Sequence, residues 1–182
     1  MSGIDSETVE RFRAYLKLLA TSQLDSCLDK RVDASDIVQQ TLLDAVAREE
    51  QFRGQSDGEL IGWLRRILAN NIVDAFRYHR REKRDASREQ SLNESVFDSF
   101  RRVDALIAPT ATPSQRATAN EQLLRLPWAL EQLSPPQRDA IVLHHLQGLK
   151  LSETSERMGK SESAVCGLLY RGLKRLSAIL EE

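Results

Sequence analysis

Ser155, Gly159, Ser161 and Val165 have the types and the spacing that two short helices joined by a tight turn require. The small Ser155 lets two helices cross closely, and Gly159 can adopt the positive φ that ends the first helix. Ser161 can cap the second helix, and Val165 falls on the face that packs against the first. The pattern predicts a helix-turn-helix, a unit whose second helix lies in the DNA major groove.

Residues for metal binding, disulfide bonding or catalysis do not occur at the spacings that these require. His79, His144 and His145 lack the spacing of metal ligands, and Cys27 and Cys166 are too isolated for a zinc ribbon or a disulfide framework. We find no set of nucleophile, base and oxyanion donors, no phosphate-binding glycine loop and no carboxylate pair suited to a cleft. We therefore expect a binding protein that is not an enzyme and that needs no metal or cofactor.

The composition of the 182 residues favours an all-α protein, since 5% are aromatic, 29% are charged, and Pro and Gly are few. No apolar run approaches the ~18 residues of a membrane span, and the first residues do not resemble a signal peptide. With so few cysteines, these features predict a cytoplasmic protein without membrane insertion.

The charges are unevenly distributed although the net charge is only −1. Residues 25–60 carry nine acidic and four basic side chains, whereas residues 65–84 carry seven basic and two acidic ones. An acidic block beside a basic block indicates that neighbouring surfaces have different partners. A solvated helix end is the alternative explanation of the basic run.

Helical periodicity defines a first domain over residues 8–84. Its first expected helix carries Val9, Phe12, Leu16 and Leu19. The second spans about residues 35–50 and the third about 59–81, with residues 52–58 as a loop between them. The expected core positions are Ile37, Val38, Thr41, Leu42, Ala45 and Val46 in the second helix, and Leu60, Leu64, Ile67, Leu68, Ile72 and Phe76 in the third.

Residues 85–112 are polar and mixed, and we interpret them as a flexible linker with a short helix near residues 96–106. A second small domain is expected over residues 113–182. Its first helix reaches about residue 133 and is expected to kink or break at Pro127, the next ends at Gly148, and the helix-turn-helix follows.

Two segments resemble the sigma-70 family of bacterial RNA polymerase sigma factors, within the extracytoplasmic-function (ECF) group. The run Asp36-Ile-Val-Gln39-Gln-Thr41, with Phe52, Trp63, Leu64, Ile67, Asn70, Asp74 and Arg77, resembles region 2, and the helix-turn-helix resembles region 4. The resemblance implies a sigma factor that binds the β′ and β subunits of core RNA polymerase and promoter DNA, and that directs promoter-specific transcription initiation. An anti-sigma factor or another regulator is a further expected partner.

The resemblance implies that the helix around Asp36 docks on the β′ subunit. The polar groups on its exposed face, with one leucine among them, suit a protein interface. The expected docking residues are Asp36, Gln39, Gln40, Leu43 and Asp44.

The resemblance also implies that residues 52–58 capture an unstacked base of the minus-ten element. Phe52 can stack on a base or plug the domain core, and Arg77 can bind phosphate or pair with Asp74. Trp63 is expected to face the core, and Arg84 is a further expected phosphate contact. The expected minus-ten contacts are Phe52, Arg53, Gln55, Ser56, Arg66, Asn70, Arg77, Arg80 and Arg81.

For the minus-thirty-five element, this sequence departs from the family pattern. Many members have Lys or Arg where Cys166 and Leu168 stand here, so the contact is either weak or made with a different sequence. Gly167 and Gly172 each lower the helix propensity by about 1 kcal/mol relative to Ala. The alternative explanation of these glycines is that they let the helix backbone approach DNA closely. Cys166 is either a small filler or a redox switch. The expected contacts are Lys160, Ser163, Cys166, Gly167, Tyr170, Arg171, Lys174 and Arg175.

Two other functions compete with a sigma factor. One is a conventional regulator whose helix-turn-helix binds an operator, and the other is a polymerase-bound adaptor without sigma activity. The segment that resembles region 2 argues against the first, because a sensing domain does not need it. The missing basic residues leave the second open.

Overall fold

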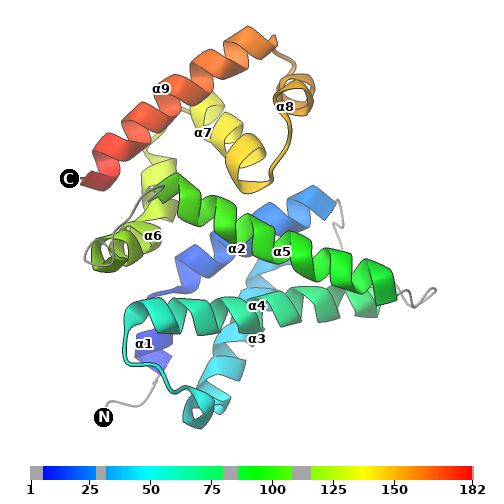
Figure 1. Ribbon diagram of the computed structural model, residues 1–182, viewed down its shortest axis with the longest axis vertical. Coiled ribbons are helices and arrows are strands. Elements are labelled where there is room, and N and C mark those ends of the chain that lie inside the picture. The colour runs from blue at the N-terminus through cyan, green and yellow to red at the C-terminus, as the bar shows by residue number, and fades with distance from the viewer. Residues whose placement is uncertain (1–5, 28–31, 80–85, 108–115, 182) are drawn as a thin grey trace. The chain divides into compact units, whose positions relative to one another are not determined.

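The computed structural model describes residues 6–27, 32–79, 86–107 and 116–181. These residues contain helices and no strand (Figure 1). The chain divides into two compact units, Met1–Phe100 and Arg101–Glu182. The prediction of an all-α protein with two helical domains is confirmed. None of the described helices combines the length and the apolar character that crossing a bilayer requires.

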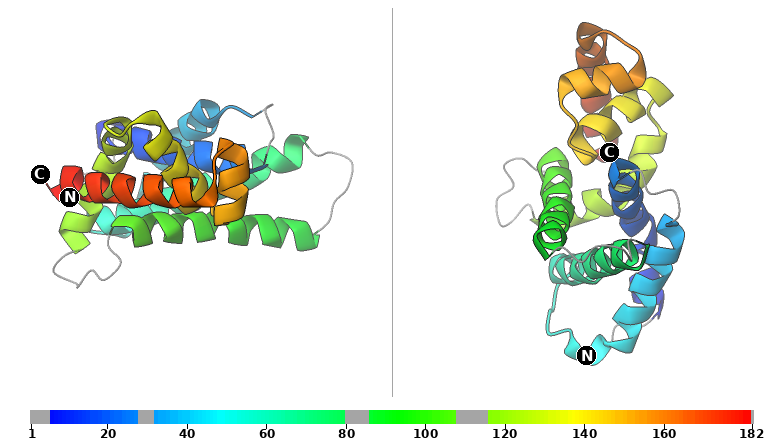
Figure 2. Two further views of the ribbon diagram at one scale, coloured as in Figure 1. Left: turned by 90° about the horizontal axis from the view of Figure 1, so that it is seen from above. Right: turned by 90° about the vertical axis from the view of Figure 1, so that its right-hand side faces the viewer.

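The first unit is built on α1 (Ser6–Glu10), α2 (Arg13–Cys27), α3 (Ala34–Ala47) and α4 (Asp57–His79). The expected first helix is divided in two at Arg11, where the Phe12 amide bonds to the Val9 carbonyl at 3.1 Å. The helices α2 and α4 both pack on α3 (Figures 1 and 2). All six expected core residues of α4 are buried, as are Phe12, Leu16 and Leu19 from α2 and the turn before it.

Helix α3 begins where Asp33 caps it, since the Asp33 carboxylate accepts a hydrogen bond from the Ser35 amide at 2.7 Å. It ends at Ala47 and is followed by a 3-10 turn, η1 (Glu49–Gln51). The expected core stripe is buried, with one exception. Val46 is 37% exposed, so its placement in the core was wrong.

The segment expected to be a flexible linker contains a 22-residue helix, α5 (Ala86–Ile107). The short helix expected near residues 96–106 therefore begins about ten residues earlier. Among residues 94–107, whose side chains are described, the buried apolar residues are Val96, Phe100 and Val103, which follow one another at spacings of four and three. The Arg65 guanidinium lies 5.6 Å from the centre of the Phe100 ring, and its Nε donates to the Tyr15 hydroxyl at 2.8 Å. This arginine thus joins α4 to α2 and α5.

The second unit contains α6 (Arg116–Glu131), α7 (Pro135–Ile141), a π-helical turn η3 (Val142–Leu146), α8 (Leu151–Met158) and α9 (Glu162–Glu181). The break allowed at Pro127 does not occur, because α6 continues past this residue. Helix α7 starts with Pro135 at its first position, where the missing amide hydrogen costs no helical hydrogen bond. Helix α8 crosses the N-terminal end of α9 (Figure 2).

Gly172 allows α9 to pack closely on α7. A Cβ atom at Gly172 would lie 3.0 Å from Ile141 Cδ1 and 3.3 Å from Gln137 Cβ. This glycine is buried against another helix, so the explanation that it lets DNA approach does not apply to it. Gly167 is in a different environment, described below.

We predict that Gly172→Leu destabilises the full chain by about 1–3 kcal/mol, because the side chain would overpack the contact with α7. Gly62→Ala is the matched control: no atom lies within 4 Å of its new Cβ, so the higher helix propensity should stabilise the chain by about 0.5–1 kcal/mol. Urea unfolding of both variants measures this. Equal stability of Gly172→Leu and the parent chain would contradict the close packing.

Candidate nucleic-acid and protein interfaces

The turn between α8 and α9 has the geometry that the sequence predicts. Gly159 adopts φ +61° and ψ +36°, which ends α8. The Ser155 hydroxyl donates to the Lys160 carbonyl at 2.5 Å, which ties the turn together. Thr154, rather than Ser155, is the fully buried side chain of α8.

The N-terminus of α9 is capped as expected. The Ser161 hydroxyl accepts from the Ala164 amide at 3.3 Å, and the Val165 side chain is fully buried. At the start of α8, the Lys150 amide donates to the Glu153 carboxylate at 2.7 Å. Both helices of the predicted helix-turn-helix therefore begin at fixed residues, which fixes the face that α9 presents.

Seven of the eight expected minus-thirty-five residues are exposed side by side along α9 or just before it. Tyr170 stands out because 72% of this large side chain is exposed. Gly167 is only half-buried, and the Arg171 guanidinium lies beside it. Residues 162–170 contain no lysine or arginine. The exposed residues are Lys160, Ser163, Cys166, Tyr170, Arg171, Lys174 and Arg175.

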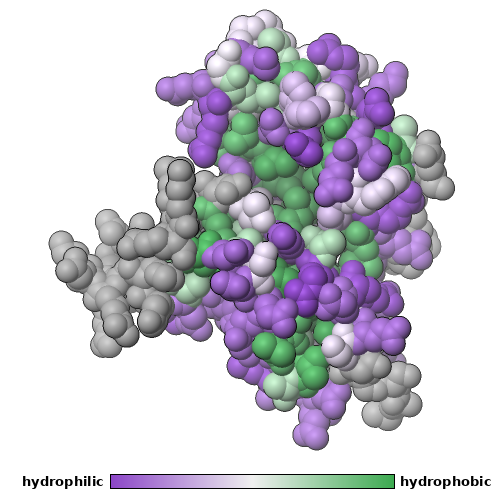
Figure 3. All heavy atoms as spheres, turned by 180° about the vertical axis from the view of Figure 1, so that it is seen from behind, coloured by the Kyte–Doolittle hydropathy of each residue, from purple (hydrophilic) through white to green (hydrophobic). Residues whose placement is uncertain are grey.

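The outer face of α3 has an apolar centre near the C-terminal end of the helix, among polar side chains. Leu43 is 55% exposed and Val46, which the sequence analysis placed in the core, adds to the same surface. Asp36 and Gln40 are also exposed. In the lower part of Figure 3, where α3 lies, a hydrophobic patch interrupts the hydrophilic surface. Exposed apolar surface among polar groups is typical of a protein-binding site.

Asp44 is oriented by α4. Its carboxylate accepts from Asn71 Nδ2 at 3.1 Å and from Gln40 Nε2 at 2.8 Å. Asn71 Nδ2 also lies 3.2 Å from the Thr41 hydroxyl. The half-buried Asp44 therefore holds α3 to α4 and fixes the side chain of Gln40 on the outer face.

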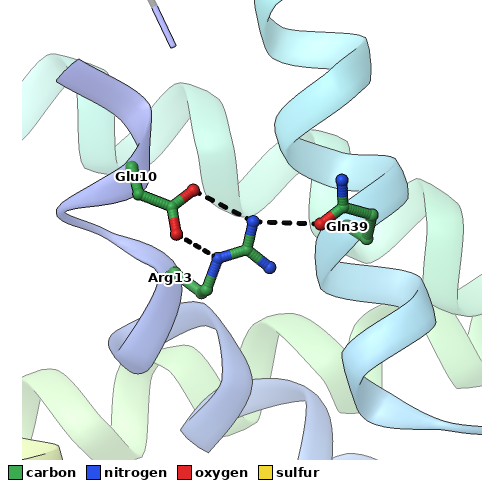
Figure 4. A network of polar contacts seen from close by, with 3 residues as sticks. All are labelled: Glu10, Arg13 and Gln39. Carbon is green, nitrogen blue, oxygen red and sulfur yellow. Dashed lines mark hydrogen bonds and ion pairs between the residues drawn. The ribbon is translucent and has the colours of Figure 1, made fainter. Parts of the chain in front are cut away.

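Arg13 connects the expected docking residue Gln39 to Glu10, the last residue of α1 (Figure 4). Arg13 Nη2 donates to the side-chain Oε1 of Gln39 at 3.0 Å and to a Glu10 carboxylate oxygen at 2.9 Å. The hydrogen bond from Arg13 lowers the pKa of Glu10. The amide nitrogen of Gln39 points away from this network (Figure 4). The sequence analysis did not identify Arg13, because its partner lies 26 residues away.

The loop before α4 is organised by Glu59. The Glu59 carboxylate accepts from the amides of Gln55 and Ser56 at 2.8 and 3.1 Å and from the Ser56 hydroxyl at 3.0 Å. The Ser56 hydroxyl accepts in turn from the Glu59 amide at 3.3 Å, which completes a capping box. These bonds, led by the one from Gln55, lower the pKa of Glu59. Arg53 and Gln55 keep exposed side chains.

Phe52 packs inside this loop. Its ring centre lies 5.3 Å from that of Trp63, and both residues are half-buried. A Cβ atom at Gly54 would lie 2.4 Å from the Phe52 ring, so the loop closes over the ring only because residue 54 is glycine. Of the two roles left open for Phe52, its environment favours the plug.

The exposed side of α4 carries some of the expected minus-ten contacts. Arg66 and Asn70 are exposed there. Arg77 pairs with Asp74, with 2.8 Å between Nη1 and Oδ1. The ion pair is one of the two roles expected for Arg77, the other being a phosphate contact. Arg65, by contrast, is held against Tyr15 and Phe100. Arg80, Arg81 and Arg84 lie outside the described residues.

A groove of about 810 Å³ lies within the second unit, between the end of α5, the η3 turn and the end of α9. His144 and His145 line it with their ring centres 4.9 Å apart, and a His144 ring nitrogen lies 2.8 Å from the Leu149 carbonyl. Burial lowers the pKa of His145, and the neighbouring His144 adds to this effect. In the described part of the chain, no group of three or more His, Cys, Asp or Glu could hold a metal ion.

Comparison with known families agrees with this geometry. The family description "Sigma-70 region 2" matches residues 8–82, and "Sigma-70, region 4" matches residues 123–176. The first match contains α3 and α4, and the second contains the helix-turn-helix.

Proteins named as sigma factors align with more than four fifths of this chain. The RNA polymerase sigma factor CarQ of Myxococcus xanthus is 30% identical over 152 residues, which cover 82% of this chain and 75% of CarQ. The chain belongs to the ECF group of the sigma-70 family. The ECF sigma factor SigG of Mycobacterium tuberculosis is 32% identical over 158 residues, covering 81% of this chain and 42% of SigG. BldN of Streptomyces coelicolor is 29% identical over 160 residues, covering 84% and 52%. The chain thus spans about half the length of the last two relatives.

We predict that Glu59→Gln lowers the stability of the first unit at neutral pH, because the Glu59 carboxylate holds the loop together. The folded-state pKa of Glu59 lies below its ordinary value of 4.5, so its contribution is complete above that pH. It is lost as the pH falls through the folded-state pKa. The difference in Tm between the parent chain and Glu59→Gln should therefore be constant from pH 7 to about pH 5.5 and shrink below pH 4.5.

Glu156→Gln on α8 controls for the loss of one negative charge. A difference for Glu59→Gln that grew on acidification would contradict the assignment, since the sign of the linkage would then be reversed.

Proposed function

We propose that this protein is a sigma factor that binds core RNA polymerase and directs promoter-specific transcription initiation. The observation that carries the proposal is the presence of region 2 and region 4, in this order, in one chain. Each region presents exposed side chains where a sigma factor needs a partner: the apolar centre on α3 and the outer face of α9. The polymerase performs the chemistry, and this chain selects the promoter and opens the strands.

Helix α3 is the proposed docking surface for core polymerase. The exposed Leu43 and Val46 supply apolar contact area, and Asp36 and Gln40 supply hydrogen-bonding groups around them. Gln39 and Asp44 are the remaining members of the expected set. Asp44 already accepts a hydrogen bond from Asn71, and Gln39 accepts one from Arg13. We therefore propose that Asp44 and Gln39 act mainly by keeping the other docking side chains in position.

The loop before α4 and the exposed side of α4 form the proposed minus-ten surface. Arg53 and Gln55 can reach base edges, because Glu59 binds the loop amides and leaves both side chains exposed. Phe52 and Trp63 form an aromatic wall behind them. Arg66 and Asn70, with the predicted contacts Arg77, Arg80 and Arg81, would follow the strand backbone. Each phosphate contact should steepen the salt dependence of binding by about one counterion.

The exposed face of α9 is the proposed minus-thirty-five surface. A helix-turn-helix places the N-terminal part of its second helix against base edges in the major groove. Arg171, Lys174 and Arg175 then supply the positive charge. We further propose that the protein acts in the cytoplasm, where core polymerase and promoter DNA are found, and that an anti-sigma factor covers the surfaces used for these partners.

Run-off transcription tests the central proposal. Purified chain added to purified core RNA polymerase should give transcripts with a defined start on a subset of promoter templates. An operator-binding regulator would instead protect DNA on its own, and an adaptor would bind polymerase without restoring specific starts. Either of these results would contradict the proposal.

We predict that replacing Gln40 and Leu43 together by Ala weakens core binding at least tenfold, because the apolar centre of the α3 surface is lost. The fold should be unaffected, since both side chains are exposed. Fluorescence anisotropy of labelled chain against core polymerase measures the affinity, and Lys17→Ala, an exposed position on α2, is the control. Unchanged affinity would show that another face docks.

A further inference from the structure

The recognition face of α9 is poor in the groups that read guanine. Exposed or half-buried residues recur along one side of the helix at Ser163, Cys166, Gly167, Tyr170 and Arg171. Of these five, Arg171 alone carries a guanidinium or ammonium group. Guanine is read most often by Arg or Lys, which donate two hydrogen bonds to its O6 and N7 atoms. The first two turns of α9 therefore lack the side chains that most often read guanine.

The same face suits thymine. The C5-methyl group of thymine is recognised in the major groove by apolar contact. Tyr170 offers a large ring that is 72% exposed, and the exposed Cys166 lies one turn earlier on the same side. The Ser161 and Ser163 hydroxyls lie 3.1 Å apart at the start of the helix, where they can bond to base edges of either kind.

Gly167 determines where the one guanidinium lies. A Cβ atom at Gly167 would be 3.2 Å from Arg171 Nη1, and the three atoms nearest to it all belong to the Arg171 guanidinium. Arg171 therefore lies along the helix toward its N-terminus, over the glycine, among the base-reading positions. A larger residue at position 167 would occupy the place of the guanidinium.

We propose that α9 reads an A·T-rich minus-thirty-five element through thymine methyl groups that contact Cys166 and Tyr170. A single guanine in that element is read by Arg171, for which Gly167 provides the room. The inference rests on the proposed sigma function, and it specifies the DNA sequence class that this sigma factor selects. Gly167 is then a positioning residue, because it acts on DNA through Arg171.

The first test selects promoters with the holoenzyme of purified core polymerase and the full chain. Templates with a randomised minus-thirty-five region are transcribed, and the sequences that give defined starts are read. The selected minus-thirty-five sequences are expected to be A·T-rich with one invariant guanine. Selection of consecutive guanines would overturn the inference and leave the sigma function intact. If no template gave a defined start, the sigma function itself would fail, and the inference with it.

The second test removes single methyl groups from a selected template. Replacing one thymine by deoxyuridine deletes only the C5-methyl, and promoter-complex formation should fall about fourfold at a contacted position. The same replacement outside the element is the control. In Tyr170→Ser holoenzyme, one position should lose its sensitivity to deoxyuridine. Equal binding of thymine and deoxyuridine templates throughout the element would overturn the methyl contacts.

The third test concerns Gly167. Arg171→Ala and Gly167→Leu should each reduce the preference for the invariant guanine roughly five- to hundredfold, and the double variant should lose no more than either one. Arg175→Ala removes a positive charge one turn farther along α9 and should weaken binding to all templates equally. Circular dichroism of every variant verifies that the helical fold is retained. A full guanine preference in Gly167→Leu would overturn the role of Gly167.

Discussion

The surfaces that we assign to core polymerase and to the minus-thirty-five element each lie on a helix whose opposite side is buried. Helix α3 can present Leu43 because Ile37, Val38 and Leu42 anchor its inner face against α2 and α4. Helix α9 can present Tyr170 because Val165 and Leu169 are buried on its inner face, among α6, α7 and α8. Burial of these aliphatic side chains supplies the free energy that holds the helices, at about 1.5–3 kcal/mol each. An apolar group can then remain exposed without the helix turning to bury it.

Polar contacts orient individual side chains on the helices that the cores hold in place. Asn71 orients Asp44, Arg13 orients Gln39, and Glu59 binds two amides of the loop before α4. Each of these hydrogen bonds contributes modestly to overall stability. Their effect is to select one orientation of a side chain that must meet a partner. A preorganised surface has less conformational entropy to lose when it binds.

The sequence predicted the helices with a strong apolar period and missed features that depend on distant partners. The six core residues expected in α4 are all buried, because they repeat at helical spacing over more than four turns, whereas the buried Ile61, Ala69 and Val73 were not predicted. The helix α5 was mostly missed, since apolar residues are sparse among the polar ones of residues 86–107 and give no strong helical period. Val46 fits the core period of α3 but lies at its end, where no neighbour covers it. The bond between Arg13 and Gln39 could not be predicted, because only the fold brings these residues together.

The two glycines of α9 show the same limit in the candidate site. Gly167 and Gly172 have equal local cost, and the sequence did not distinguish a structural role from a role at DNA. Packing does, because Gly172 faces Ile141 on α7 whereas Gly167 faces the guanidinium of Arg171.

Hydroxyl-radical footprinting of side chains, with the protein alone, with core polymerase and with core polymerase plus promoter DNA, tests the account most directly. Leu43 and Tyr170 are suitable reporters, since they are 55% and 72% exposed in the chain. The account predicts that core polymerase protects Leu43 and leaves Tyr170 reactive, and that promoter DNA then protects Tyr170. Protection of Tyr170 by DNA without polymerase, or a fully reactive Leu43 in the complex, would contradict it.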